Sequence, residues 1–186
     1  LGASPPRGRP AVVLPAGAVA PALLAGQVGG GIWFQVGAAL EATAVVGFAI
    51  GYVSLIHRSE RRRVGFYGPL FGAASGVAAI ALGLSFAFGA ITPELVTPHL
   101  RLNLLGFLGL TMVGVAFQFY PPAVGRLPGS TDRAALLAIG LLAGGLWGQA
   151  AGLVTGLRPA VTLGQTLALL GAVGYTYLLL GTFRAR

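Results

Sequence analysis

Few side chains in this sequence could carry chemistry, and the informative ones lie inside long apolar stretches. Glu41 interrupts an uncharged stretch. It lies about nine residues from the start of that stretch, at a depth where an ionised carboxylate in a membrane is costly and is usually paired or protonated. The position predicts either a structural carboxylate, protonated or paired to one partner, or a residue for proton transfer or ligand binding. Both interpretations stay open at the level of the sequence.

A second polar group opens another apolar stretch, directly after Pro98. It consists of His99, Arg101 and Asn103. At about 3.6 residues per turn, one helical stripe collects His99, Asn103, Gly106, Leu110 and Gly114, with Thr111 and Gln118 at its edge. A polar or small stripe is typical of a helix face that contacts protein or a cavity and not lipid. We expect this group near Glu41, with a Glu41–Arg101 or Glu41–His99 pair, while a plain interfacial role for His99 at a helix start remains the alternative.

Several kinds of chemistry are excluded. The chain has no Cys, which removes disulfides, thiolate metal sites and Cys nucleophiles. His57 ends one apolar stretch and His99 begins another on the opposite side of the expected membrane, about 30 Å away, so a single metal or haem cannot be bound by both within one chain. No Ser-His-Asp grouping, phosphate-binding glycine loop or carboxylate pair is present. The sequence therefore assigns no catalytic residue.

The elements that must position these side chains are membrane spans. Of 186 residues 55% are hydrophobic and 9% are charged, which excludes an ordinary soluble domain, a disordered chain and a collagen-like chain. The 12 basic residues are all Arg and stand in short clusters between apolar stretches. Such clusters are typical of topology signals, so we expect a lipid bilayer and no nucleic acid as the partner of this basic chain.

The sequence predicts an all-α, polytopic transmembrane bundle that forms a single domain over residues 1–186. Five spans are firm because each has about 20 apolar residues, enough to cross a hydrocarbon core of about 30 Å. A sixth, at the N-terminal end, carries Pro15 and Pro21 and could instead be a processed secretory signal. The six predicted spans are about 11–28, 32–56, 69–92, 100–119, 134–155 and 161–183.

The Arg clusters predict the orientation of the bundle. They follow the second span, follow the fourth span and end the chain, whereas the alternate loops hold few charges. By the positive-inside rule the Arg-rich loops and both termini are cytoplasmic. We expect an integral protein of a prokaryotic cell membrane.

Glycine is the next strong signal, with 31 residues. Two ladders repeat every fourth residue: Gly68, Gly72 and Gly76, and Gly140, Gly144, Gly148, Gly152 and Gly156. Small residues at this spacing let membrane helices approach closely. The ladders predict tight packing within the bundle, and the longer one could alternatively form a homo-oligomer seam, a contact in a larger complex or a groove for a flat cofactor or lipid.

The stretch from Pro98 to Gly114, followed by Phe117-Gln118-Phe119-Tyr120-Pro121-Pro122, resembles a segment of small relatives of haem-copper oxidase subunit I. In those relatives a helix begins His-x-His-x-Asn-Leu-x-Gly and ends with an aromatic residue and a proline. The resemblance implies an all-helical membrane bundle in which the histidines of this helix bind haem or a metal. It also implies cofactor-binding roles for His99, Arg101 and Asn103, with His99 as the haem or metal ligand and Arg101 contacting a propionate.

This chain departs from that pattern at two positions. Arg101 stands in the place of the second histidine, and Gln118 stands near the helix end where some relatives have another His. With no further His on the outer side, the chain cannot form a complete haem-copper centre by itself.

Three functions follow as hypotheses. The first is a haem-copper-oxidase-like membrane protein that binds haem through His99 or serves as an accessory respiratory or nitrogen-oxide-linked subunit, and is not a complete enzyme on its own. The second is a small transporter or channel-like bundle that uses Glu41. The third is a purely structural subunit of a larger membrane complex.

Overall fold

The computed structural model describes residues 31–59, 64–89, 92–123 and 132–184, and all the regular structure in these ranges is helical. The predicted first span at 11–28 lies outside the described residues. The helices are α2 (Gly31–Arg58), η1 (Val64–Phe66), α3 (Tyr67–Ala87), α4 (Pro93–Arg101), η2 (Leu102–Leu110), α5 (Thr111–Ala123), α6 (Asp132–Thr155) and α7 (Arg158–Arg184). The predicted all-α class is confirmed.

Five of these helical stretches are long and apolar enough to cross a membrane: Gly31–Arg58, Val64–Ala87, Pro93–Phe117, Arg133–Thr155 and Arg158–Gly181. They correspond to the five firm spans of the sequence. The third stretch is one continuous helix, because α4, η2 and α5 follow one another without a break. Large apolar side chains on the outside of the bundle, such as Ile50, Met112 and Leu169, are exposed, as lipid-facing residues of a membrane protein are.

Two predicted span boundaries were wrong. The span placed at 69–92 ends at Ala87, where Phe88 and Gly89 close the last turn on the carbonyls of Leu84 and Phe86, and Gly89 adopts a φ of 97° that other residues rarely take. The span placed at 100–119 begins earlier, with Pro93 in its first turn. Proline is well tolerated there because the first helical N–H groups have no intrahelical acceptor.

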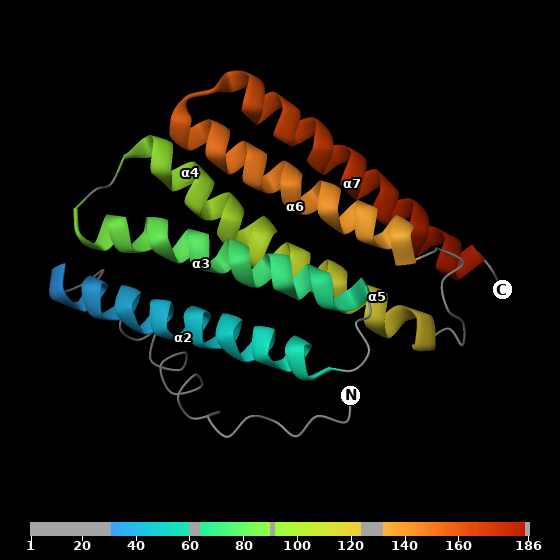
Figure 1. Ribbon diagram of the computed structural model, residues 1–186. Helices are drawn as coiled ribbons and strands as arrows, with labels where there is room; N and C mark the ends of the chain where they lie inside the picture. Colours follow the sequence, from blue (N-terminus) through green and yellow to red (C-terminus); the bar gives the residue numbers. More distant parts are fainter. Residues whose placement is uncertain (1–30, 60–63, 90–91, 124–131, 185–186) are drawn as a thin grey trace.

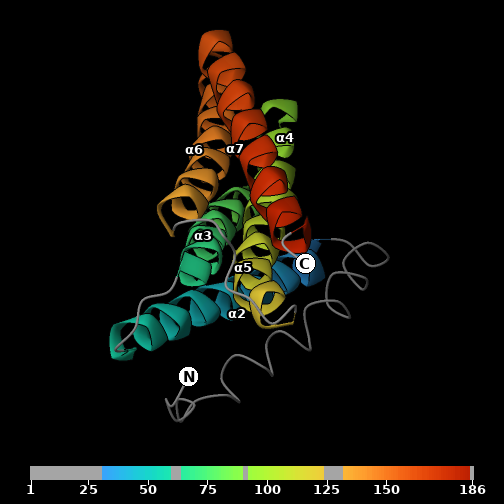
Figure 2. The same ribbon diagram turned by 90° about the vertical axis from the view of Figure 1, so that its right-hand side faces the viewer.

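The helices form an antiparallel bundle in which neighbours in sequence are neighbours in space (Figure 1). α2 packs on α3, and α3 packs on the helix made by α4, η2 and α5. α6 packs on α4 and η2 on one side and along α7 on the other. α7 contacts the rest of the described bundle mainly through α6. In the view turned by 90°, α7 lies alongside α6, and α2 crosses below α3 and α5 (Figure 2).

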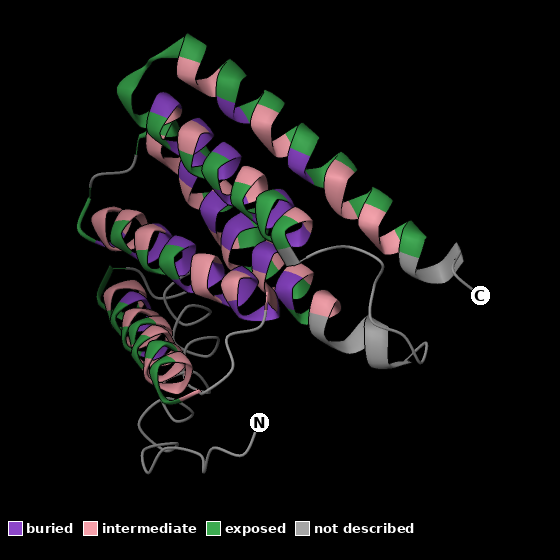
Figure 3. Cartoon of the chain, turned by 45° about the vertical axis from the view of Figure 1, so that its right-hand side comes forward, coloured by how far each residue is buried: buried purple, intermediate pink, exposed green. Residues whose placement is uncertain are grey.

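The shorter glycine ladder packs α3 against η2 and α5, as predicted. A Cβ at Gly68 would lie 2.5 Å from the carbonyl oxygen of Leu110, and one at Gly72 would lie 2.9 Å from that of Phe107. Side chains larger than hydrogen therefore do not fit at these two positions. Figure 3 shows buried residues along the inner faces of the helices and exposed residues along the outer face of α7, the helix that leads to the C-terminus.

η2 is a nine-residue π-helix within the continuous helix that α4, η2 and α5 form. The buried residues follow a spacing of four along the continuous helix: Pro98, Leu102, Gly106, Leu110 and Gly114. The predicted stripe is therefore confirmed at Gly106, Leu110 and Gly114. Toward the start of the helix the buried positions are Pro98 and Leu102, one residue before the predicted His99 and Asn103.

The predicted packing role of the longer glycine ladder was only partly right. Gly152 packs on α7, where a Cβ would lie 2.7 Å from the backbone nitrogen of Val161, whereas added Cβ atoms at Gly140 and Gly144 would meet nothing within 4 Å. The close contact with α7 runs instead through Gly145 and Gly164, whose backbones touch. Gly156 ends α6 with a φ of 71° and belongs to the turn.

Candidate functional site

A pocket of about 150 Å³ lies between α2, α3 and α4, near the end of the bundle where α2 and α4 begin. Glu41 and His99 both line it, so the predicted proximity of these two residues is confirmed. Glu41 is ten residues into α2, a depth of about 15 Å at 1.5 Å per residue. The remaining lining residues are apolar: Phe34, Ala38, Ile80, Gly83, Leu84 and Phe86.

Glu41 lies half-buried on the face of α2 that turns toward α3. Within the described part of the chain its carboxyl group makes no hydrogen bond and no ion pair. No buried side-chain oxygen or nitrogen among the described residues lacks a hydrogen-bond partner, so the carboxyl oxygens reach open space and are not sealed in the packing. The carboxyl group of Glu41 is therefore an acidic group without a described partner at the pocket.

His99 is held in a fixed orientation by α3. Its Nδ1 lies 2.8 Å from the carbonyl oxygen of Ala79, and because that oxygen only accepts, Nδ1 carries a proton and donates it. Phe86 packs edge-on against the imidazole with ring centroids 5.2 Å apart. Gly83 leaves room for the ring, since a Cβ there would lie 3.1 Å from Cε1 of His99. Nε2 makes no described hydrogen bond, so it is the ring atom of His99 left to contact a ligand in the pocket.

Arg101 does not join this pocket, and the predicted Glu41–Arg101 pair is wrong. Its Nη1 donates a hydrogen bond to Oε1 of Gln149 on α6 at 2.6 Å. Gln149 is buried, with 6% of its surface exposed. The guanidinium group therefore links α4 to α6, on the other side of α4 from Glu41.

Asn103 also stays outside the pocket. Asn103 is half-buried in η2, and it forms no hydrogen bond with the residues that the structure describes. Leu102, 3% exposed, takes the inward position that α-helical periodicity predicted for Asn103. The side chain of Gln118 lies outside the described part of the chain.

Two further polar contacts were missed by sequence reasoning. Gln149 accepts from Arg101, and Trp147 Nε1 donates to the hydroxyl of Ser75 at 3.1 Å, which itself donates to the carbonyl of Phe71 at 2.8 Å. A signal existed for Gln149, since an amide in the middle of an apolar span needs a partner in lipid. These contacts tie α6 to α3 and α4.

The space beside His99 is small. The pocket has a volume of about 150 Å³, below the roughly 300–1,000 Å³ that drug-sized ligands occupy, and its walls are mainly side chains of α2 and α3. Arg101, the expected propionate partner, donates to Gln149. Among the described residues no three His, Cys, Asp or Glu side chains come together. The hydrogen bond between Nδ1 and the Ala79 carbonyl is of the kind that orients a ligating histidine, and His99 as a haem or metal ligand stays a prediction from the sequence.

Fold and site together define an all-helical integral membrane protein with a carboxyl–imidazole pocket between three of its spans. Comparison with protein families, with characterised proteins and with solved structures finds no match. The resemblance to haem-copper oxidase subunit I thus stays a prediction from the sequence.

Proposed function

We propose that this protein moves protons across a membrane, with Glu41 and His99 as the groups that take up and release them. The observation that carries the proposal is the shared pocket: a carboxyl group and an imidazole from different helices line one space inside an otherwise apolar bundle. Ionisable residues inside membrane spans commonly mark ion pathways and proton relays.

The geometry assigns a role to each group. Glu41 contributes a carboxyl group that has no hydrogen bond or ion pair within the described residues. His99 is anchored through Nδ1 and packed by Phe86, which holds the imidazole ring at the pocket. A carboxyl group and an oriented imidazole that line one pocket are the kinds of group that carry proton transfer.

Glu41→Gln tests this function directly. The purified protein is reconstituted in liposomes that contain a pH-sensitive dye, and a potassium diffusion potential, negative inside, drives protons inward. We expect acidification with the parent protein and a rate no greater than that of empty liposomes with Glu41→Gln, because the amide cannot exchange a proton at this position.

Glu94→Gln is the matched control, since Glu94 lies exposed in the first turn of α4, away from the pocket, and should leave the rate unchanged. No acidification with the parent protein, or equal rates for the parent and Glu41→Gln, would contradict the proposal. In that case co-purification of large subunits would favour the structural-subunit hypothesis.

The haem hypothesis is tested on the same preparation. A Soret band in the absorption spectrum of the purified protein that disappears in His99→Ala would assign a haem to His99, and it would require a wider pocket than the one found here.

A further inference from the structure

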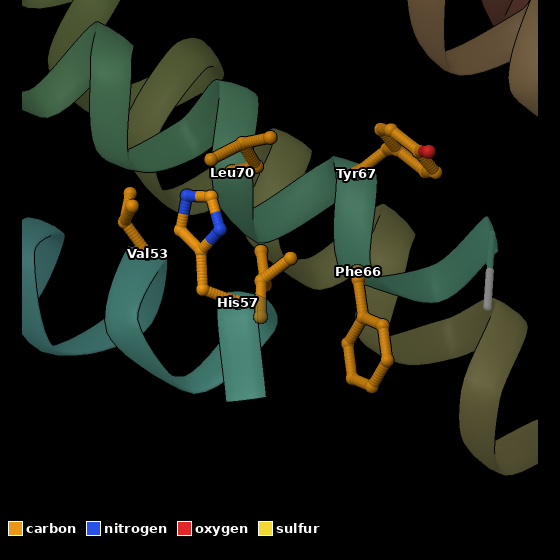
Figure 4. A pocket seen from close by; sticks show the side chains of 6 residues that line it. Val53, His57, Phe66, Tyr67 and Leu70 are labelled. Atoms are coloured by element: carbon orange, nitrogen blue, oxygen red, sulfur yellow. The ribbon is translucent and has the colours of Figure 1, made fainter. Parts of the chain in front are cut away.

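A second pocket, of about 170 Å³, lies at the opposite end of α2, between its last turns and the start of α3. It is lined by Val53, Ile56, His57, Phe66, Tyr67 and Leu70. His57 is 16 residues from Glu41 along α2, or about 24 Å at 1.5 Å per residue, so the two pockets are separate. Figure 4 shows the His57 ring directed from the end of α2 toward Leu70, with Val53 beside it, while the hydroxyl group of Tyr67 points away.

This pocket combines an apolar interior with a basic edge. The last turn of α2 holds His57 and Arg58, and both side chains are exposed. The first turn of α3 has no acidic residue and no side-chain hydrogen bond at its cap. The described end of α2 beside the pocket is thus basic through Arg58, and the wall of the pocket is hydrocarbon and aromatic.

We propose that this pocket binds an anionic phospholipid. Its position at the end of a span is the depth at which a lipid phosphate meets the first carbons of its acyl chains. The apolar wall of Val53, Ile56 and Leu70 suits the upper part of one acyl chain. His57 lines the pocket, and Arg58 follows it in the exposed last turn of α2, where its guanidinium group suits the phosphate. Basic residues at a membrane surface attract anionic lipids, at about 1 kcal/mol for each Lys or Arg, which is about fivefold in affinity.

Native mass spectrometry of the detergent-solubilised protein tests the proposal with two lipids of identical acyl chains, phosphatidylglycerol and phosphatidylcholine. We expect the parent protein to bind phosphatidylglycerol at least about fivefold more tightly, because the headgroup adds a net negative charge. Arg58→Gln should lower the affinity for phosphatidylglycerol about fivefold, whereas Arg158→Gln, an exposed arginine at the start of α7, should not.

A large side chain placed inside the pocket distinguishes lipid binding in the pocket from general attraction of anionic lipids to the protein surface. Val53 and Val77 are each 39% exposed, but only Val53 lines the pocket. Val53→Trp should weaken phosphatidylglycerol binding without a change of charge, and Val77→Trp on α3 should not. Thermal unfolding in the same detergent shows whether each variant is folded.

Three results would overturn the proposal: equal affinity for the two lipids, equal losses in a variant and its matched control, or unchanged phosphatidylglycerol binding in both Arg58→Gln and Val53→Trp. Full competition by glycerol phosphate, which has no acyl chain, would also overturn it and would assign the basic edge to a free phosphate instead.

Discussion

Polar side chains inside this bundle are fixed by partners on other helices, and Arg101 illustrates the effect. Its guanidinium group is half-buried and donates to the buried amide of Gln149. Hydrogen bonds to charged groups contribute about 1.5–3 kcal/mol to stability. If the acceptor Gln149 is removed, the guanidinium group of Arg101 is left without this acceptor in apolar surroundings. The stability of the α4–α6 contact therefore depends on this pair.

Gln149→Leu should lower the free energy of unfolding by about 1.5–3 kcal/mol, because Arg101 loses its acceptor. Denaturation in mixed micelles, followed by circular dichroism, measures the change. Arg101→Met alone and the double variant complete a double-mutant cycle. The double variant should be no less stable than Gln149→Leu, since two apolar side chains need no partner, and fully additive losses would contradict the pairing.

At the residue scale the sequence located Glu41 and His99 but not the partner of Arg101. The first two stand out because ionisable groups inside an apolar span are rare. The direction of Arg101 depends on which helix packs beside α4 and on side-chain reach, neither of which periodicity reveals. Asn103 was misplaced because Leu102, four residues before Gly106, takes the inner face, and helical periodicity allows either position there.

Helix α7 is held mainly by one neighbour, α6, through a regular seam. Small residues lie where the backbones of α6 and α7 approach most closely. Along each helix the contacting residues are spaced alternately three and four positions apart, as in left-handed helix pairs. On α6 the seam contains Ala138, Leu142, Gly145, Gln149 and Gly152, and on α7 it contains Val161, Gly164, Ala168 and Gly171. The contact relies on backbone approach, so it is sensitive to a single added side chain.

Gly164→Val should destabilise the protein by about 3 kcal/mol, the upper end of the usual cost of overpacking. A Cβ at Gly164 would lie 2.5 Å from the backbone nitrogen of Gln149, and backbone cannot move aside as a flexible side chain can. Gly140→Val is the control, because nothing lies within 4 Å of a Cβ there and valine has a somewhat higher helix propensity than glycine. Equal unfolding midpoints for the two variants would count against this seam.

The five firm spans and their helical type were predictable because length and hydropathy decide them. The faces on which these helices meet were harder to predict. A four-residue glycine repeat marks a face on which helices are able to meet, but Gly140 and Gly144 face outward while Gly145, outside the repeat, carries the contact. The pairing of α6 with α7 decides which glycines are used, and this pairing is a tertiary property.

Because successive helices run in opposite directions, the connections between them lie at two opposite ends of the bundle. The turn after α3 and the turn between α6 and α7 lie at one end, and the residue after α2 lies at the other, as Figure 1 shows. Because the chain has no cysteine, single cysteines can report this arrangement without background.

Thr92→Cys and Leu157→Cys should react with a membrane-impermeant maleimide from the same side of sealed membranes, and Ser59→Cys should react only from the other side. Labelling of intact cells and of inverted vesicles measures the two sides separately. The positive-inside rule further predicts that Ser59→Cys is labelled from the cytoplasm. Labelling of Thr92→Cys and Ser59→Cys from one side would be incompatible with a span at α3.

The hydrogen bonds that α6 makes to α3 and α4 have a consequence for the order of assembly during synthesis. Arg101 and Ser75 enter the membrane before α6 is made, but Gln149 and Trp147, which complete their contacts, arrive later. The hydroxyl group of Ser75 already donates to the carbonyl of Phe71 on its own helix. Arg101 has its described hydrogen-bond acceptor, Gln149, only after α6 is made. A nascent chain that stops before α6 therefore holds Arg101 without the hydrogen-bond acceptor that completes the contact between α4 and α6.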